Sequence, residues 1–298
     1  MNDPLVSVVI PAYNQAEYLG DAVQSVLKQT YPHVEVIVVD DASPDDTASV
    51  MSRFDDPRVR FITHDTNRRL PATRNTGILA SSGEIIAFLD ADDYYHAEKL
   101  KAHVDFLSRH PEVGATYNAR YELNHSSETI REIWRPPLTV GLEDFVLGFP
   151  FAPSDMVMRR EWAFRVGLFN PNMGSAEDTD FPCRLALAGC RFAAIDRVLN
   201  YRRYHSGRGR KNLPGRLNDV ERAQDAVFTD PRCPQAVLSL CPTAIKHHLM
   251  VIVSLAFIQE QTQFGQECVR RLVHIDRSVV EGSPCELLSF LLMESVAD

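Results

Sequence analysis

The chain has 298 residues, of which 45% are hydrophobic and 24% are charged, and its formal net charge is −9. This length suits one large α/β domain of roughly 200–250 residues with an appendage. The net negative charge argues against a protein that binds nucleic acid broadly, because such binding needs a basic surface.

The first 117 residues alternate short apolar runs with segments of helical spacing. The apolar runs predict buried strands at Val6–Ile10, Val34–Val39, Val59–Thr63, Ile85–Leu89 and Val113–Tyr117. Helical spacing predicts helices at Tyr18–Gln29, Pro71–Ala80 and Ala97–Arg109, and Ala42–Asp46 supplies a further helix start. This alternation predicts an α/β fold with a parallel sheet covered by helices on both faces.

From residue 118 the pattern is less regular. Short strands are expected at Arg131–Trp134, Asp155–Met158, Arg191–Ile195 and Val198–Tyr204. Short helices are expected at Glu161–Val166 and Asp178–Ala188. From Gly215 onward the pattern is helical, with a buried helix at Met250–Phe257 and loops near Pro231, Pro234, Pro242 and Pro284.

Acidic residues follow two of the predicted strands, as Asp40-Asp41 and as Asp90-Ala91-Asp92-Asp93. In open sheets of this kind ligands bind beyond the carboxyl ends of the strands, so five carboxylates are expected at one edge. Such carboxylates repel one another. Mg²⁺ or Mn²⁺ is the simplest compensation, since hard cations bind carboxylate oxygens and often bridge to substrate phosphates. The alternative is a solvated acidic turn with helix-capping roles.

The residues after the first strand lack a G-x-G-x-x-G motif and read Pro11-Ala12-Tyr13-Asn14. That motif holds a pyrophosphate on a helix N-terminus in dinucleotide-dependent enzymes. Its absence argues against a dehydrogenase of that type and favours a diphosphate that is neutralised by a metal.

Four segments, in this order, resemble the signatures of family 2 glycosyltransferases: Ser7–Asn14, Val38–Ser43, Ala72–Gly77 and Asp90–Asp93. The resemblance covers about residues 5–205. It implies the GT-A fold, which is Rossmann-like with a mostly parallel central sheet flanked by helices. It also implies a nucleotide-diphospho-sugar donor, a divalent cation and, in most members, inversion at the anomeric carbon.

By this resemblance Pro11, Tyr13 and Asp41 line the nucleobase pocket, with Tyr13 stacked on the base. Asp41 suits a base N–H because a carboxylate is an acceptor. Its alternative role is to cap the next helix, which Asp40 could also do. Arg74 is expected to face the diphosphate or the base, and its alternative is a surface salt bridge.

The resemblance assigns Asp90 to the ribose and Asp92 to the metal that bridges the two phosphates. For Asp93 the alternative is a capping role for the helix that follows.

A second acidic segment, Ser175–Phe181, resembles the family's E-D motif, in which the aspartate is the catalytic base. This assigns Asp178 as the base that accepts a proton from the acceptor hydroxyl, with Glu177 in reserve for acceptor binding. The alternative is that Glu177, Asp178 and Asp180 only favour the dipole of a helix first turn.

A basic segment follows. From Arg197 to Asn218 there are seven arginines or lysines and no acidic residue. Tyr201–Lys211 resembles the family's late Y-R-x-H segment, in which His205 completes the diphosphate or metal site. The glycines among residues 206–211 suit a mobile lid, and the alternative is a solvated basic loop.

Acceptor specificity is expected from residues 118–175, including Trp134, Phe149–Phe151 and Trp162, although aromatic residues are also ordinary core. Three roles are open for the helical region 215–298: it packs on the catalytic domain, forms a homodimer, or touches a membrane surface. It has no strongly basic amphipathic face, so membrane docking is the weaker of these.

Cysteines and apolar runs indicate the compartment. The six cysteines form no C-x-x-C pair, which indicates reduced thiols. The amino-terminal segment lacks the charge and apolar length of a signal peptide. The longest apolar run, Leu249–Ile258, has 10 residues, whereas a bilayer helix needs about 20. We expect a cytoplasmic protein without a transmembrane helix, or one bound peripherally at the inner face of the membrane.

These observations predict a catalytic domain over residues 1–214, with a nucleotide-sugar-binding half (1–117) and an acceptor and catalytic-base half (118–214), followed by the helical region 215–298. The expected donor is a UDP-sugar by default, and the expected acceptor is a carbohydrate or glycolipid. One alternative is a sugar nucleotidyltransferase, but such an enzyme needs a glycine-rich, basic loop after the first strand, and here that loop has no basic residue and no glycine before Gly20. The other is a non-catalytic nucleotide-sugar-binding module, against which Asp92 and Asp178 argue.

Overall fold

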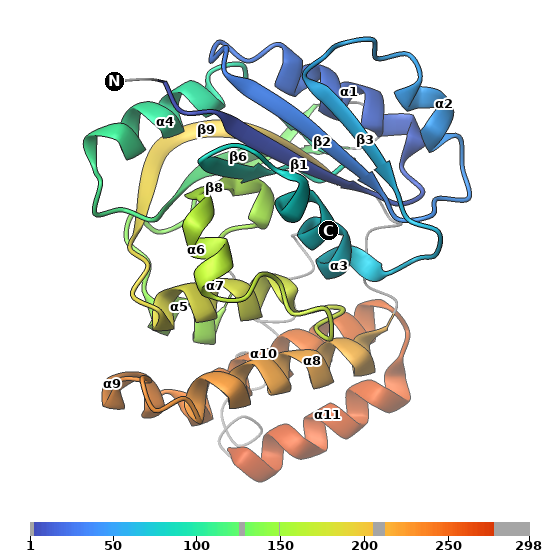
Figure 1. Cartoon of the computed structure of the whole chain (residues 1–298). Coiled ribbons are helices and arrows are strands. Elements are labelled where there is room, and N and C mark those ends of the chain that lie inside the picture. Colours follow the sequence, from blue (N-terminus) through green and yellow to red (C-terminus); the bar gives the residue numbers. More distant parts are fainter. Residues whose placement is uncertain (1–2, 125–128, 149, 205–211, 277–298) are drawn as a thin grey trace.

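The computed structural model describes residues 3–124, 129–148, 150–204 and 212–276 (Figure 1). Its strands are β1 (Val6–Ala12), β2 (Val34–Asp40), β3 (Val59–Thr63), β4 (Ile85–Phe88), β5 (Tyr94–Tyr95), β6 (Ala115–Asn124), β7 (Ile130–Trp134), β8 (Met156–Arg159) and β9 (Phe192–Tyr204). They form one sheet in the order β3-β2-β1-β4-β8-β6-β9-β5, with β7 paired to β6.

Helices cover both faces of this sheet and extend beyond it. They are α1 (Ala16–Leu27), α2 (Thr47–Met51), α3 (Arg69–Ala80), α4 (Lys99–Arg109), α5 (Leu142–Leu147), α6 (Arg160–Arg165), α7 (Glu177–Leu187), α8 (Leu213–Phe228), α9 (Gln235–Leu238), α10 (Cys241–Ile258) and α11 (Thr262–Ile275), with a short 3-10 turn at Pro153–Asp155.

The amino-terminal half of the sheet is parallel, as predicted. β1 pairs in parallel with β2 and with β4, and β2 pairs in parallel with β3. Every residue of β1 and β4 is buried, which explains their continuous apolar character. The carboxyl ends of β1, β2 and β4 therefore meet at one edge of the sheet.

The other half of the sheet is mixed. β8 is antiparallel to β4 and to β6, whereas β9 is parallel to β6. The prediction of two strands over residues 191–204 is wrong, because β9 is one continuous strand. Asp196 and Arg197 interrupt its apolar pattern, but they have no partner in the β6 register and the strand bulges there. β6 also crosses residue 117, so the two predicted halves of the catalytic domain share one sheet.

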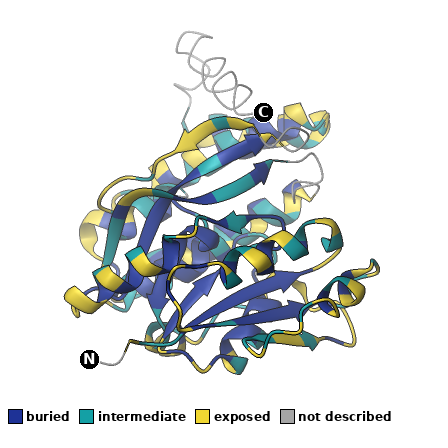
Figure 2. Ribbon diagram, turned by 90° about the horizontal axis from the view of Figure 1, so that it is seen from above, coloured by how far each residue is buried: buried dark blue, intermediate teal, exposed yellow. Residues whose placement is uncertain are grey.

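The helices form two layers around the sheet and a further unit below it. One face packs against α1 and α4, and the opposite face packs against α3, α5, α6 and α7. A third core joins α8, α10 and α11 at the base of the molecule (Figure 1). Figure 2 shows the central strands buried and the exposed positions gathered on loops and outer helix faces.

The carboxyl-terminal helices depart from prediction in two ways. Pro242 does not mark a loop, since it lies in the first turn of α10, where its missing N–H costs no hydrogen bond. α10 is only partly buried, with Phe257 exposed and Ile252–Ala256 buried. Its mean hydropathy of 1.5 and length of 18 residues meet the threshold for a membrane span by composition alone, and 39% of it is buried within the protein.

Candidate functional site

Tyr13, Asn14 and Ala42 lie at the carboxyl ends of β1 and β2, at the predicted edge. The Tyr13 side chain is 50% exposed, whereas Pro11 before it is buried. Asn14 and Ala42 adopt positive φ angles of 56° and 59°, a region that residues other than glycine seldom adopt and that clusters at functional sites. The Asn14 N–H donates to Ser43 Oγ at 3.1 Å, which ties the two loops together.

Asp41 is buried and fixes the start of α3. Its Oδ1 lies 2.7 Å from His64 Nδ1 and accepts the Arg68 N–H at 2.8 Å, while Oδ2 accepts the Arg69 N–H at 2.8 Å. A carboxylate has about four acceptor positions, so these contacts leave room for one further donor. Contact with a nucleobase therefore stays a prediction. Asp40 accepts the Ser43 N–H at 3.0 Å and holds the turn that follows β2.

Three carboxylates gather after β4. One oxygen from each of Asp90, Asp92 and Asp93 lies within 4.8 Å of the others. Asp92 and Asp93 are buried, and the Asp90 side chain is 26% exposed. The proposed capping role for Asp93 is wrong, because β5 follows it and its Oδ1 accepts the Arg203 N–H of β9 at 3.1 Å. This set of hard oxygen ligands fits a divalent cation.

Arg74 joins this cluster to the second acidic segment. Its guanidinium is buried and donates to Asp90 Oδ1 at 2.9 Å and to Glu177 Oε1 at 3.0 Å. Burial lowers the pKa of Arg74, but the Asp90 and Glu177 carboxylates more than offset it, so the pKa is raised and the charge is kept. The alternative of a surface salt bridge is wrong. A contact with the donor diphosphate stays a prediction.

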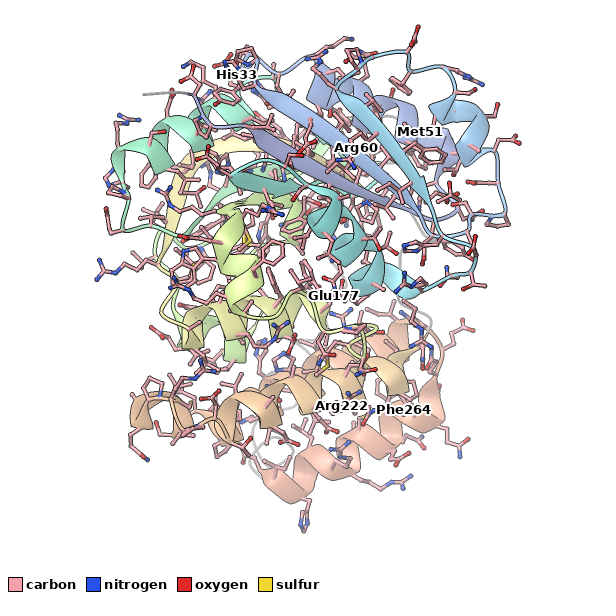
Figure 3. The ribbon with its side chains drawn as sticks, in the orientation of Figure 1. His33, Met51, Arg60, Glu177, Arg222 and Phe264 are labelled. Carbon is pink, nitrogen blue, oxygen red and sulfur yellow. The ribbon has the colours of Figure 1, made fainter. Side chains whose placement is uncertain are left out.

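Glu177 and Asp178 open α7 beside this guanidinium, and Glu177 lies between α3 and the carboxyl-terminal helices in Figure 3. Burial raises the pKa of both carboxyls, and their mutual repulsion adds to the effect on Glu177. The charges of Arg216 and Arg74 act in the opposite direction on Asp178. A carboxylate with a raised pKa is a stronger proton acceptor near neutral pH, which suits a general base.

Neighbouring residues that sequence patterns did not single out hold this arrangement. The Asn75 side chain donates to the Phe169 carbonyl at 2.8 Å and accepts the Phe169 N–H at 2.9 Å. The Asp90 N–H donates to Ser154 Oγ at 3.1 Å, and the Ser154 carbonyl accepts from the buried Lys99 Nζ at 3.0 Å. Burial lowers the pKa of Lys99 to about 7. The only signal for Asn75 was its place in the Ala72–Gly77 motif.

The remaining predicted site residues have different outcomes. Of the aromatic acceptor candidates, Trp134 is 40% exposed, whereas Phe151 is core and Trp162 is partly buried against it. Phe149, His205 and the predicted lid at 206–211 lie outside the described residues. The five described cysteines are free thiols.

A groove at the opposite end of the sheet does not coincide with this site. It has a volume of about 1010 Å³ and is lined by the segments that precede β1 and β4, by α4, by the end of β8 and by α6. Arg159 in its lining donates to the carbonyls of Leu107, His110 and Val113 and is therefore structural.

Comparison with known proteins gives a family match. Residues 7–166 match the family model described as Glycosyl transferase family 2. The Escherichia coli protein WfgD, named UDP-Glc:alpha-D-GlcNAc-diphosphoundecaprenol beta-1,3-glucosyltransferase, is 38% identical over 107 residues, 36% of this chain and 42% of WfgD. The chain thus spans about two fifths of the length of the first curated relatives it matches.

Solved structures give the fold. TarS 1–349 of S. aureus in complex with UDP-GlcNAc has a TM-score of 0.68 at 17% identity, covering 94% of this chain and 92% of that one. The mannosyltransferase PcManGT of Pyrobaculum calidifontis, in complex with GDP-Man and Mn²⁺, has a TM-score of 0.65 at 20% identity, covering 98% and 86%. At these identities the likeness shows the fold, which is GT-A as predicted.

Proposed function

Because the chain belongs to glycosyl transferase family 2, we propose that it moves a sugar from a nucleotide-diphosphate donor to an acceptor hydroxyl with inversion. The observation that carries this proposal is the pair of hydrogen bonds made by Arg74. These bonds bring the acidic cluster after β4 and the Glu177–Asp178 pair into one site. Inverting transfer needs both a stabilised leaving group and a base for the acceptor.

Asp92 is the proposed principal ligand of a divalent cation, Mn²⁺ or Mg²⁺, with Asp90 and Asp93 beside it. Three carboxylates with oxygens this close fit such an ion, and a neighbour of the same fold was crystallised with Mn²⁺. When bound, the cation would stabilise the negative charge that grows on the departing diphosphate.

The donor nucleotide would be bound by the loops after β1 and β2. The exposed ring of Tyr13 is available for stacking on a base, and Pro11, two residues before it, is buried at the end of β1. Asp41, buried at the start of α3, keeps one acceptor position for a base N–H. Asp90 would accept from the ribose, and Arg74 would present positive charge toward the diphosphate.

Asp178 is the proposed general base. It would take the proton from the acceptor hydroxyl while the nucleotide leaves from the opposite face of the sugar. Burial raises the pKa of Asp178, which strengthens it as a proton acceptor. Glu177, fixed by Arg74, would orient the acceptor.

A UDP-sugar is the default donor, since TarS binds UDP-GlcNAc, although PcManGT binds GDP-Man. A carbohydrate or glycolipid acceptor is proposed because WfgD acts on a diphosphoundecaprenol-linked sugar. Such acceptors would bring a cytoplasmic protein to the inner face of the membrane. A role for the carboxyl-terminal helices in a homodimer stays a prediction.

The first test is donor hydrolysis and transfer with and without Mn²⁺. Asp92→Asn is expected to remove metal-dependent turnover, lowering it by about 10²-fold or more because charge on the leaving group goes unstabilised. Asp55→Asn is the matched control, since Asp55 is exposed and remote from the edge. Unchanged metal-dependent turnover in Asp92→Asn would contradict the metal assignment, and a wild type inert toward every donor would contradict the function.

A further inference from the structure

The loop that leads into Glu177 and Asp178 is held from outside the α/β domain. Asp219 Oδ2, on α8, accepts the Ser175 N–H at 3.0 Å. Arg222, one turn further along α8, donates to the Asn172 carbonyl at 3.3 Å and to Asp219 Oδ1 at 3.3 Å. Figure 3 shows Arg222 on the helical unit below Glu177. The loop 172–176 thus rests on two side chains of one carboxyl-terminal helix.

α7 depends on such outside contacts because its own start offers no capping group. Its N-cap is Ala176, which is buried and has no side-chain oxygen to accept the orphan N–H groups of the first turn. The anchors of the preceding loop therefore contribute to how the helix presents Glu177 and Asp178, together with the bond from Arg74 to Glu177.

Asp219 also lies close to Arg69, a residue next to the proposed nucleotide-binding loops. A Cβ added to Gly174 would lie 3.3 Å from Arg69 Nη1 and 3.7 Å from Asp219 Oδ2, so both charged groups lie close over this glycine. The Arg69 N–H in turn donates to Asp41 at 2.8 Å. The side chain of Asp219 is only 13% exposed, as expected for a group that acts inside a contact.

We propose that α8 is a positioning element of the active site. This inference rests on the glycosyl transfer proposed above. Asp219, with Arg222 beside it, holds the loop that presents the base. The carboxyl-terminal helical unit is then part of the catalytic apparatus and not only an appendage packed on it.

The test compares Asp219→Ala with Asp219→Asn, which keeps an acceptor oxygen, and with Asn218→Ala, an exposed neighbour on α8. In Asp219→Ala we expect amide hydrogen exchange of residues 172–178 to rise about 10-fold without substrate, because local opening is easier. We expect kcat to fall about 10–100-fold, since small misplacements of a catalytic group are costly, while the donor KM changes by less than about 2-fold. Asp219→Asn should recover most of kcat, and Asn218→Ala should match the wild type.

Should Asp219→Ala fail to fold, Arg222→Gln removes the other α8 contact with the loop and is measured in the same way.

Wild-type exchange of residues 172–178 in Asp219→Ala would overturn the proposal, and so would faster exchange with an unchanged kcat. Amide hydrogen exchange is measured without a sugar donor or acceptor. A wild-type protein that transfers no sugar would therefore contradict the proposed function, while exchange still decides whether Asp219 holds the loop.

Discussion

Arg74 connects two groups of carboxylates that the sequence separates widely. It reaches Asp90, 16 residues away, and Glu177, 103 residues away. Its own motif indicated a functional residue, but no local pattern could predict that one guanidinium spans both groups. Such a buried ion triad is costly to assemble in the interior, and removing only its cation leaves two charges uncompensated.

Arg74→Met is expected to lower the free energy of unfolding by about 3 kcal/mol near neutral pH, the lower end of the range for breaking a buried ion pair, because Asp90 is partly solvated. The loss should shrink as the pH falls, because burial raises the pKa of Glu177 and the protonated carboxyl no longer needs a cation. Urea unfolding at several pH values measures this. Arg68→Met, at an exposed arginine of the same segment, should change stability by less than about 0.5 kcal/mol. A loss that grows on acidification would contradict the expectation.

Asp178→Asn should lower transfer by about 10²–10⁴-fold if Asp178 is the base. In the wild type, the acid limb of kcat should lie above the ordinary carboxyl range of about 4, because burial raises the pKa of Asp178 and Glu177 and the active base must be deprotonated. Asp180→Asn is the matched control, since Asp180 is bonded to Arg184 instead. Equal loss in both variants, or a limb at pH 4, would argue against this assignment.

At the scale of elements, α3 is the piece that brings the site together, and Gly77 determines how close it lies to the sheet. A Cβ at Gly77 would lie 2.3 Å from Val9 Cγ1 on β1. Gly77→Ala should therefore push α3 away and lower stability by about 1–3 kcal/mol, as overpacking does. kcat should fall too, because Arg74 and Asn75 move with the helix.

Val9→Ala provides the control for this close approach, since it opens space where the new methyl group would lie. The double variant should be more stable than the sum of the two single changes predicts, with a coupling of about 1 kcal/mol or more. Strict additivity in denaturant unfolding would show that the contact between α3 and β1 does not limit position 77.

The strands that lead to the proposed donor site could be predicted because burial on both faces leaves an unbroken apolar run, as in β1 and β4. The rest depended on partners distant in sequence. β9 continues through the polar pair Asp196–Arg197 only because a bulge against β6 absorbs it. α5, with six residues between Gly141 and Gly148, is too short for a periodic signal. The bond from Asp219 to Ser175 spans 44 residues and leaves no local mark.

At the scale of the whole molecule, α8 belongs to two cores at once. Its Val227 packs in the core beneath the sheet, whereas Leu213 and Leu217 pack with α10 and α11. Gln224 on the same helix donates to the Val146 carbonyl of α5 at 3.2 Å and lies 2.9 Å from His248 of α10. Within the described residues, pulling α8 away from either core would therefore expose apolar side chains of that core.

We therefore expect one cooperative unfolding transition for the catalytic domain and the helical unit together. A nucleoside diphosphate with Mn²⁺ should shift the whole transition, by about 2.7 kcal/mol at a ligand concentration of 100 Kd, since only the native state binds. Calorimetry and far-ultraviolet circular dichroism measure the number of transitions, and Mn²⁺ alone is the control. Two transitions, of which the ligand moves only one, would mean that the helical unit unfolds without disturbing the site. That result would also remove the mechanical basis for α8 acting on Asp178.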